Sequence, residues 1–203
     1  VCRLMEDEGM CYFFEHEQDK HVLVIADDPS AFGAITGEAT VRFVTPSGAI
    51  MSGEHVQRFH FSSEMRTGKV TVRDFDFKKP ALLVEGVNEG AKDTDLEQYD
   101  HPGDVVLPAD GATVAKLRVQ ERNALRHVGE GEGAVTRLAA GATFTLSEHA
   151  RESFNREYLI TRVEHRGAEP SMMEAGDTLA RYENRFECIP SDVPFRPPLV
   201  TPR

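Results

Sequence analysis

Four dipeptides in the sequence combine a carboxylate with an imidazole, namely Glu15-His16, Glu54-His55, Glu148-His149 and Glu164-His165. Such a pair can relay a proton or bind a metal ion when both side chains point to the same place. Neighbouring residues of a β-strand point to opposite faces of the sheet, which prevents this on a strand. We therefore expect the four pairs to be exposed polar residues at strand edges.

The sequence also lacks the motifs of other catalytic and metal sites. His55 and His60 do not have the i, i+4 spacing of a helical zinc site and belong to no HExxH frame. Ser47 and Ser52 stand outside any GxSxG elbow, so nothing in the sequence activates them as nucleophiles. Carboxylates are too numerous for a glycosidase-like pair to be identified without geometry. The sequence predicts no catalytic residue, no metal site and no cofactor.

The glycine-rich stretch GEGEG at Gly129 to Gly133 does not fit phosphate binding. Its glycines do not have GxGxxG spacing, no lysine follows them, and Glu130 and Glu132 would repel a phosphate. We expect a flexible surface loop here.

Aromatic residues are a further candidate for ligand binding. Six phenylalanines stand in apolar alternations that could stack nucleobases, namely Phe13, Phe14, Phe59, Phe61, Phe75 and Phe77. Sheets that stack bases need a basic surround, whereas this chain of 203 residues has a formal net charge of −11. Its field repels phosphate backbones and anionic lipid headgroups. We therefore expect core phenylalanines and no nucleic-acid partner.

The composition is that of a globular chain with a core of its own. Hydrophobic residues make up 40% and charged residues 28%, and no apolar run approaches the roughly 18 residues of a membrane helix. We expect no stable insertion into a membrane. Cys2, Cys11 and Cys188 match neither a disulfide framework nor a CxxC metal site, so we interpret them as reduced core residues of a protein that folds in the cytoplasm.

The first residues predict a helix followed by a hairpin. VCRLMEDEG has apolar residues at helical spacing, and Gly9 stands where a helix takes its left-handed cap. Because the chain opens in this way, we expect it to start part-way through a domain. The apolar runs Met10 to Phe14 and His21 to Ile25 flank the polar stretch EHEQDK and predict two paired strands.

The middle of the chain predicts further strands and turns. TPSG at Thr45 to Gly48 predicts a turn. In KVTVRDFDF the two valines share one face while the two phenylalanines share the other, so we expect a bulge near Arg73 or Asp74. ALLVEGV predicts a strand, and NEGAKDTDLEQYDHPGDVV predicts a long acidic loop.

The second half predicts one more helix and then strands. TVAKLRVQERNALRHVGEGEG roughly places Ala115, Leu117 or Arg118, Ala124 and Leu125 on one helical stripe, and the glycines end the helix. Three further strands are expected, at Gly141 to Leu146, Glu157 to His165 and Arg181 to Ile189. With about eight strands against two helices, the fold class is mainly β with minor α, built of barrels or sandwiches.

The end of the chain is rich in proline. Five of the 11 prolines lie in the last 14 residues, namely Pro190, Pro194, Pro197, Pro198 and Pro202. They stiffen this segment toward an extended course and exclude a helix. Spaced apolar residues such as Val193, Phe195 and Leu199 are unusual for a disordered tail, so we expect it to pack on its own surface or on that of a neighbour.

Several longer motifs occur in order along nearly the whole chain. RLMEDEGMCYFFEH at Arg3 to His16 is similar to R-L-x-E-x-E-G-x-x-Y-F-F-E-H, and HVLVIADDPSAF follows it. Next come YDHPGD at Tyr99 to Asp104, EYLITRVEHRG at Glu157 to Gly167 and YENRFECIPSDVPFRPPLVTPR at Tyr182 to Arg203. Together they resemble the VgrG spike proteins of type VI secretion systems, which are related to the hub proteins of contractile phage tails.

This resemblance implies phage tail hub-like β-barrel domains with one or two short helices. Residues 1–100 would be the C-terminal part of a first hub-like barrel region with a connecting segment. Residues 101–189 would be a second such region, and residues 190–203 a proline-rich joint to a downstream barrel and needle. The valine-glycine repeats of the family do not occur in this chain.

The resemblance also implies a mechanical function without catalysis in this segment. The chain would be the hub part of a homotrimeric spike that sits on a hexameric tube protein, carries tip or effector proteins and punctures target envelopes. The tail would be a rigid joint that transmits axial thrust. The protein would assemble in the cytoplasm and then be secreted or injected without a signal peptide.

Three other functions compete with this interpretation. A phage or prophage tail hub shares the architecture, and an envelope-degrading enzyme fragment is a less favoured alternative. A carbohydrate-binding β-barrel would use exposed aromatic residues, but the chain has no tryptophan and 4 tyrosines.

Overall fold

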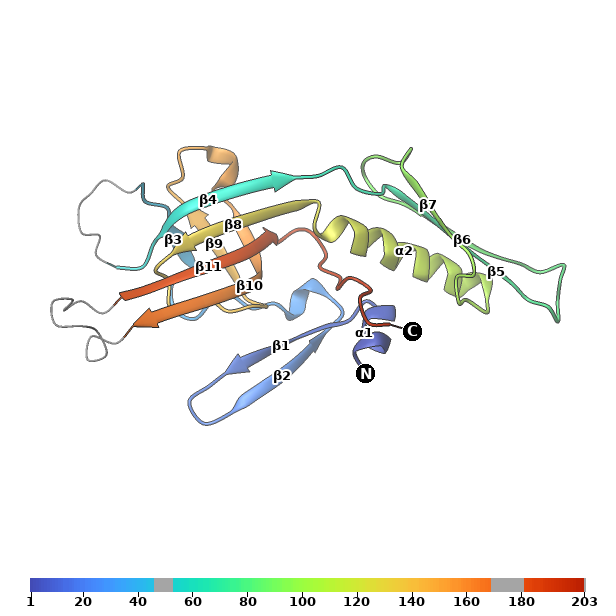
Figure 1. Ribbon diagram of the computed structural model, residues 1–203, viewed down its shortest axis with the longest axis horizontal. Helices are drawn as coiled ribbons and strands as arrows, with labels where there is room; N and C mark the ends of the chain where they lie inside the picture. Colours follow the sequence, from blue (N-terminus) through green and yellow to red (C-terminus); the bar gives the residue numbers. More distant parts are fainter. Residues whose placement is uncertain (46–52, 169–180, 203) are drawn as a thin grey trace.

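The structure is a computed structural model that describes residues 1–45, 53–168 and 181–202. Within these residues the chain forms two α-helices and eleven strands, which confirms a mainly β fold with minor α. The strands belong to three separate sheets (Figure 1). The turn expected at Thr45 to Gly48 lies largely outside the described residues.

The largest sheet has six strands in the order β3-β9-β10-β11-β8-β4. These are β3 (Thr40–Arg42), β9 (Thr143–Ser147), β10 (Glu157–Ala168), β11 (Arg181–Pro190), β8 (His127–Gly133) and β4 (Val56–Ser63). All neighbours pair antiparallel except β3 and β9, which are parallel. A bridge between Phe43 and Val56 joins the two edge strands at one end, so the sheet curls into a half-barrel.

The main core lies inside this curled sheet. Tyr158, Phe144 and Leu146 are fully buried, and the Phe59 ring packs 5.3 Å from the Tyr158 ring. The Tyr158 hydroxyl donates a hydrogen bond of 3.0 Å to the carbonyl of Phe154, in the short 3-10 helix η2 (Glu152–Phe154). Burial raises the pKa of Tyr158 to about 12. The hydroxyl therefore stays neutral and holds η2 against the core.

The GEGEG stretch is part of strand β8, so the expected flexible loop is wrong. β8 pairs with β11 on one side and with β4 on the other. A Cβ atom on Gly131 would lie 2.2 Å from the Phe186 ring, and one on Gly129 would lie 2.7 Å from the Phe59 ring. These glycines therefore leave room for aromatic rings that pack flat over the strand.

A second sheet forms an extended arm with a helix on one of its faces (Figure 1). Its order is β6-β5-β7, with β5 (Lys69–Phe75), β6 (Leu83–Glu89) and β7 (Glu97–Asp100). Val70 and Val72 of β5 pack with Ala115 and Val119 of α2 (Pro108–Ala124) in a second core. We call β5, β6 and β7 the arm.

Three expectations for the arm and α2 are wrong. β5 pairs with β6 in one continuous register from Lys69 to Phe75, so the expected bulge is wrong. The long acidic loop contains strand β7, which pairs parallel with β5. Helix α2 begins earlier than expected, with Pro108 in its first turn, and ends at Ala124, before the glycines.

The N-terminal helix and hairpin are confirmed. Helix α1 (Cys2–Asp7) is followed by its C-cap Glu8 and then by Gly9, whose φ is 69°. Gly9 N–H donates to the Glu6 carbonyl and Met10 N–H donates to the Met5 carbonyl, which are the two bonds of a Schellman cap. Strands β1 (Cys11–His16) and β2 (His21–Ala26) then form a two-stranded antiparallel hairpin, followed by the 3-10 helix η1 (Pro29–Ala31).

The three sheets do not divide the chain at residue 100. The six-stranded sheet takes β3 and β4 from before this point and its other four strands from after it. Between β4 and β8 the chain forms the arm and then helix α2, which packs on it.

Candidate interaction surfaces

Two of the four carboxylate-imidazole pairs are exposed on strands, as expected. Glu15 and His16 lie on β1, and Glu164 and His165 lie on β10. His16 contacts His21 on the neighbouring strand, with 2.7 Å between their Nδ1 atoms.

The Glu54-His55 pair is not at an exposed strand edge, because it precedes β4 and joins this segment to residues 136–137. Glu54 accepts hydrogen bonds from Thr136 and from Arg137 Nε, the latter at 2.7 Å. Burial raises the pKa of Glu54, but these hydrogen bonds outweigh it and hold the pKa below its ordinary value. His55 is buried and donates from Nδ1 to the Gly53 carbonyl. The pair therefore has a structural role, because it fixes the segment that precedes β4.

The Glu148-His149 pair follows β9 and also differs from the expectation. Glu148 is exposed with a φ of 61°, whereas His149 is half-buried. The His149 ring packs 4.4 Å from the Phe43 ring and 4.9 Å from the Phe154 ring. The imidazole thus packs with aromatic rings of the main core.

The cysteines are free thiols in three different environments. Burial raises the pKa of Cys188, which is a core residue as expected. Cys11 is half-buried and Cys2 is exposed, so the core expectation is wrong for Cys2. A terminal helix with no buried residue cannot enclose that side chain.

The phenylalanines also divide into core and surface residues. Phe59 and Phe61 pack against the main core, as expected. Phe13 is half-buried and its ring lies 5.7 Å from the Phe32 ring. Three others are exposed by 48%, 61% and 76%, namely Phe14, Phe75 and Phe77. Their exposure overturns the expectation of a core role and makes them candidates for contacts with a partner.

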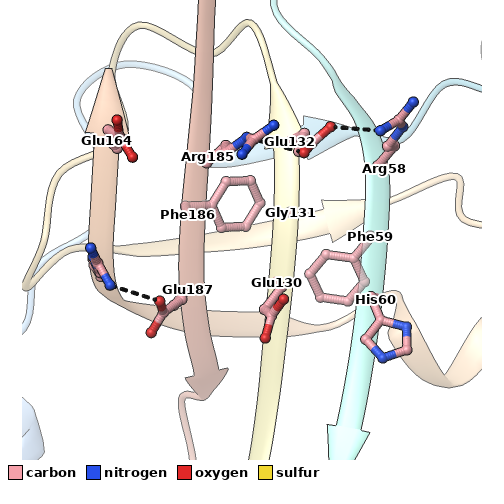
Figure 2. Close-up of a pocket in the computed structure, with 11 residues that line it drawn as sticks. Arg58, Phe59, His60, Glu130, Gly131, Glu132, Glu164, Arg185, Phe186 and Glu187 are labelled. Carbon is pink, nitrogen blue, oxygen red and sulfur yellow. Dashed lines mark hydrogen bonds and ion pairs between the residues drawn. The ribbon is translucent and has the colours of Figure 1, made fainter. Parts of the chain in front are cut away.

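A charged groove of about 460 Å³ crosses the six-stranded sheet (Figure 2). It extends over β4, β8, β11 and β10, whose alternate residues present arginine and glutamate side chains. Glu132 of β8 accepts from Arg58 of β4 and from Arg185 of β11, each at 3.1 Å. Arg162 and Glu187 form a further pair at 3.4 Å.

The register explains this alternation of charge. Arg58 is opposite Glu132, Glu132 is opposite Arg185, and Arg185 is opposite Glu164. One row across four strands therefore alternates positive and negative side chains, which favours cross-strand pairing. Hydrogen bonds from Arg166 hold the pKa of Glu164 below its ordinary value, so this carboxylate accepts hydrogen bonds at neutral pH. The groove is suited to a polar contact.

Metal binding has no support from the described side chains. Across residues 1–45, 53–168 and 181–202, no group of three or more His, Cys, Asp and Glu residues could hold a metal ion. The prediction that the chain has no catalytic or cofactor-binding residue stays a prediction.

The tail, residues 191–202, packs on the chain's own N-terminal region. Arg196 is the centre of this contact. Its Nε donates to Gln120 of α2 at 2.9 Å, and its Nη1 donates to the carbonyls of Gly9 and Asp27 at 2.9 and 2.5 Å. One guanidinium therefore joins the tail to α2, to the end of α1 and to the end of the hairpin.

Glu6 of α1 holds the end of the tail. It accepts from the backbone N–H groups of Val200 and Thr201, and from the Thr201 hydroxyl at 2.7 Å. The hydroxyl bond is the main reason that the pKa of Glu6 lies below its ordinary value. The contacts of Arg196 and Glu6 form a tail clamp, and the two chain ends lie side by side (Figure 1).

The hairpin has one packed face and one exposed apolar face. Phe13 on the packed face lies against Gly141, where a Cβ atom would come within 2.3 Å of its ring. The opposite face exposes four large side chains by 48% to 57%, namely Tyr12, Phe14, Leu23 and Ile25. The register places Tyr12 opposite Ile25 and Phe14 opposite Leu23. We call these four residues the hairpin face.

The arm also has an exposed apolar face, on the side away from α2. It consists of four side chains exposed by 45% to 61%, namely Phe75, Leu83, Val87 and Tyr99. Phe75 is opposite Leu83, while Val87 and Tyr99 are both opposite Thr71. We call these four residues the arm face.

The chain matches a described protein family over most of its length. The family described as phage tail baseplate hub (GPD) matches residues 1–171. No helix in the described part of the chain is long and apolar enough to cross a bilayer.

Curated relatives include several spike proteins of Pseudomonas aeruginosa. The chain is 35% identical to the type VI secretion system spike protein VgrG4b over 100% of this chain and 27% of that protein. It is 32% identical to the spike protein VgrG1b over 100% of this chain and 28% of that protein. The actin cross-linking toxin VgrG1 of Vibrio cholerae is 25% identical over 96% of this chain and 18% of the toxin. The chain thus spans less than a third of the length of these relatives.

Two solved structures share the fold. One is the E. coli c3393 protein, described as a type VI secretion component with structural similarity to T4 bacteriophage tail proteins gp27 and gp5. It has a TM-score of 0.58 and 17% identity over 98% of this chain and 39% of that chain. The other is the 43 kDa tail protein of prophage MuSo2 from Shewanella oneidensis, with a TM-score of 0.61 and 12% identity over 96% of this chain and 54% of that chain. With most of its residues matched by the hub family and its fold shared with tail proteins, the chain belongs to the phage tail baseplate hub (GPD) family.

Proposed function

We propose that this chain is the hub part of a trimeric spike in a contractile injection machine of the type VI secretion class. The hub sits on the hexameric tube protein and carries a needle with tip or effector proteins toward a target envelope. The observation that carries this proposal is the similarity to VgrG spike proteins over the whole chain, at 32% to 35% identity.

The proposal assigns a mechanical part to each segment. Residues 1–100 supply the end of one hub-like barrel region with its connecting segment, and residues 101–189 supply a second region, and strands from both regions pair in the six-stranded sheet. Residues 190–203 are the joint to a downstream barrel and needle. The protein assembles in the cytoplasm and leaves the cell without a signal peptide.

The packing of the tail supports a joint that bears load. A tail that only led away from the hub would transfer thrust through one covalent chain. The Arg196 and Glu6 contacts instead connect the tail to α1, α2 and the hairpin at once. Thrust applied to the tail is therefore distributed over several elements.

The test uses the complete gene product in the bacterium that encodes it. We expect native mass spectrometry to show a homotrimer and the tube protein to appear in the culture medium. A joint variant, Pro197→Gly with Pro198→Gly, should reduce secretion of the tube protein, because glycine removes the stiffness of the segment. A monomeric product, or secretion that does not depend on the gene, would rule out the spike function.

A phage or prophage tail hub is the second candidate, since the matching family and the MuSo2 tail protein both belong to phage tails. Genes for tail tube, capsid and terminase beside the coding frame would favour it, whereas secretion-system genes would favour the spike.

We also propose that this segment has no envelope-degrading activity. The similarity to spike proteins, which are structural parts of the machine, supports this proposal. Incubation of residues 1–203 with purified peptidoglycan should release no soluble muropeptides above a heat-denatured control.

A further inference from the structure

The β1–β2 hairpin and the arm extend in different directions from the molecule (Figure 1). Each of these two sheets has an inner side that packs on the rest of the protein and an outer side that exposes four large apolar residues. Within the described residues, neither outer face is covered by another element. Contiguous apolar patches of this kind are uncommon on monomers and mark sites of association.

Two faces of this size are sufficient for the centre of an interface. Eight side chains that are about half exposed would bury roughly 700 Å² of apolar surface in contact with one another. A standard interface buries about 1,600 Å² in total, with its apolar part at the centre. Polar residues at the rim would supply the remaining area.

We propose that the hairpin face of one copy packs on the arm face of the next copy, so that the copies form a closed ring with head-to-tail contacts. A single heterologous contact repeated around a ring covers both faces of every copy. This inference deepens the proposed hub function by naming the surfaces through which the copies meet, and it takes the number of copies from that function.

Charge sets the direction in which the two faces meet. The hairpin turn carries Glu17 and Asp19 against one lysine, Lys20, which pairs with Glu17 at 3.2 Å. The turn of the arm carries the adjacent lysines 78 and 79, both exposed, against one carboxylate, Asp76, which accepts from their backbone N–H groups. The acidic hairpin turn therefore lies beside the basic arm turn, which places Phe14 and Leu23 over Phe75 and Leu83.

The charged side chains on the arm face are already paired with each other. Arg73 lies 3.8 Å from Glu85, and Lys69 lies 3.5 Å from Glu97 and 4.0 Å from Glu89. A partner that covers this face consequently buries pairs of opposite sign and not isolated charges, which lowers the desolvation cost.

Crosslinking of the complete gene product tests the contact. In a Cys2→Ser background, the variant with Leu23→Cys and Leu83→Cys is treated with a short bismaleimide. We expect covalent dimers and trimers, because each chain carries both halves of the contact. Chains with only one of the two cysteines should stay monomeric on a denaturing gel. Leu23→Cys combined with Lys116→Cys, on the exposed side of α2, is the matched control and should give no ladder.

Mixed crosslinking distinguishes head-to-tail contacts from other arrangements. When differently tagged Leu23→Cys and Leu83→Cys chains are expressed together, the crosslinked dimer should contain both tags. Dimers of Leu23→Cys chains alone would show that the hairpin faces meet each other, and would overturn the proposal. A trimer without any crosslink would overturn it too, while the hub function would stand. A monomer would overturn both.

Charge reversal gives an independent readout. Glu17→Lys with Asp19→Lys should weaken association about threefold to tenfold, and so should Lys78→Glu with Lys79→Glu. Both pairs together should restore most of the affinity, because opposite charges again face each other. Asp95→Lys, at an exposed position of another turn, should have no effect. A combined variant weaker than either pair alone would overturn the proposed orientation.

Discussion

At Gly131, the absence of a side chain allows β8 to lie inside the sheet, between β11 and β4. The Phe186 ring occupies the space that a Cβ atom on Gly131 would need, and the Phe59 ring does the same at Gly129. Both glutamates of the GEGEG stretch line the charged groove, and Glu132 pairs with Arg58 and Arg185. One side of this stretch is thus covered by aromatic rings from the neighbouring strands, and the other side carries its own charged side chains.

We expect Gly131→Ala to lower the free energy of unfolding by about 1–3 kcal/mol, because the new methyl group must displace the Phe186 ring. Urea unfolding of the chain measures this difference. Gly167→Ala, at an exposed position of β10 with nothing within 4 Å of the added Cβ, is the control and should be neutral or slightly stabilising. Equal effects of the two changes would contradict the packing argument.

Glu6 makes the tail clamp sensitive to acid. Its pKa lies below the ordinary value of 4.5, mainly because the Thr201 hydroxyl donates to the carboxylate. A carboxyl group whose pKa is lowered by folding stabilises the fold fully above its unfolded pKa. This contribution is lost as the pH falls through the lower pKa of the folded protein.

An NMR titration of the Glu6 carboxyl carbon should therefore show a pKa below 4.5, and the Thr201 amide signal should shift in the same pH range. Thr201→Val, which removes the hydroxyl and keeps the shape, should raise the Glu6 pKa toward its ordinary value. A pKa at or above 4.5 in the unaltered chain would show that the clamp is absent in solution.

At the scale of elements, one side of the hairpin packs within the chain and the other side is exposed and available to a partner. Phe13 and Phe14 are neighbours, yet one packs over Gly141 while the other belongs to the exposed hairpin face. Strand geometry causes this, because successive side chains point to opposite sides.

Under conditions where the chain is monomeric, we expect Phe13→Ala to lower the free energy of unfolding by about 2 kcal/mol, since its ring is half-buried. Phe14→Ala should change it by less than about 1 kcal/mol. Denaturant melts of both variants make the comparison. A larger loss for Phe14 would mean that its face is covered within a single chain.

The tail is the element whose position depends most on one residue. Arg196→Ala removes three hydrogen bonds that the charged guanidinium donates, and it should lower the free energy of unfolding by about 2 kcal/mol. Hydrogen exchange at the Leu199 and Val200 amides should become faster at the same time. Arg162→Ala, which removes an exposed pair with Glu187, should leave both measurements nearly unchanged.

At the scale of the whole molecule, net charge limits the partners. The chain carries a formal net charge of −11, and the arginines of the groove are paired with glutamates. We expect no shift of a DNA fragment by residues 1–203 at micromolar protein and 150 mM salt, because non-specific binding depends on neutralising phosphates. A shift that disappears with salt would reveal a basic surface formed by the fold.

The sequence alone indicated the fold class, the N-terminal cap at Gly9, the hairpin and the family. Each of these depends on local rules or on residue identity: the φ of a glycine, alternation on a strand, or a run of matching motifs. The position of β8 inside the sheet was not predictable, because the glycines that suggest a loop pack against rings on β4 and β11, far away in sequence.

The interaction surfaces divide in the same way. Sequence identified the proline-rich tail and the need for its apolar residues to pack, but Arg196 carries no local signal that it meets Gly9, Asp27 and Gln120. Likewise, alternation shows that Phe14 and Phe75 lie on one side of a strand without showing whether that side is covered. Burial is a property of the assembled chain, so only the tertiary structure decided which apolar residues form the core and which remain available to another copy.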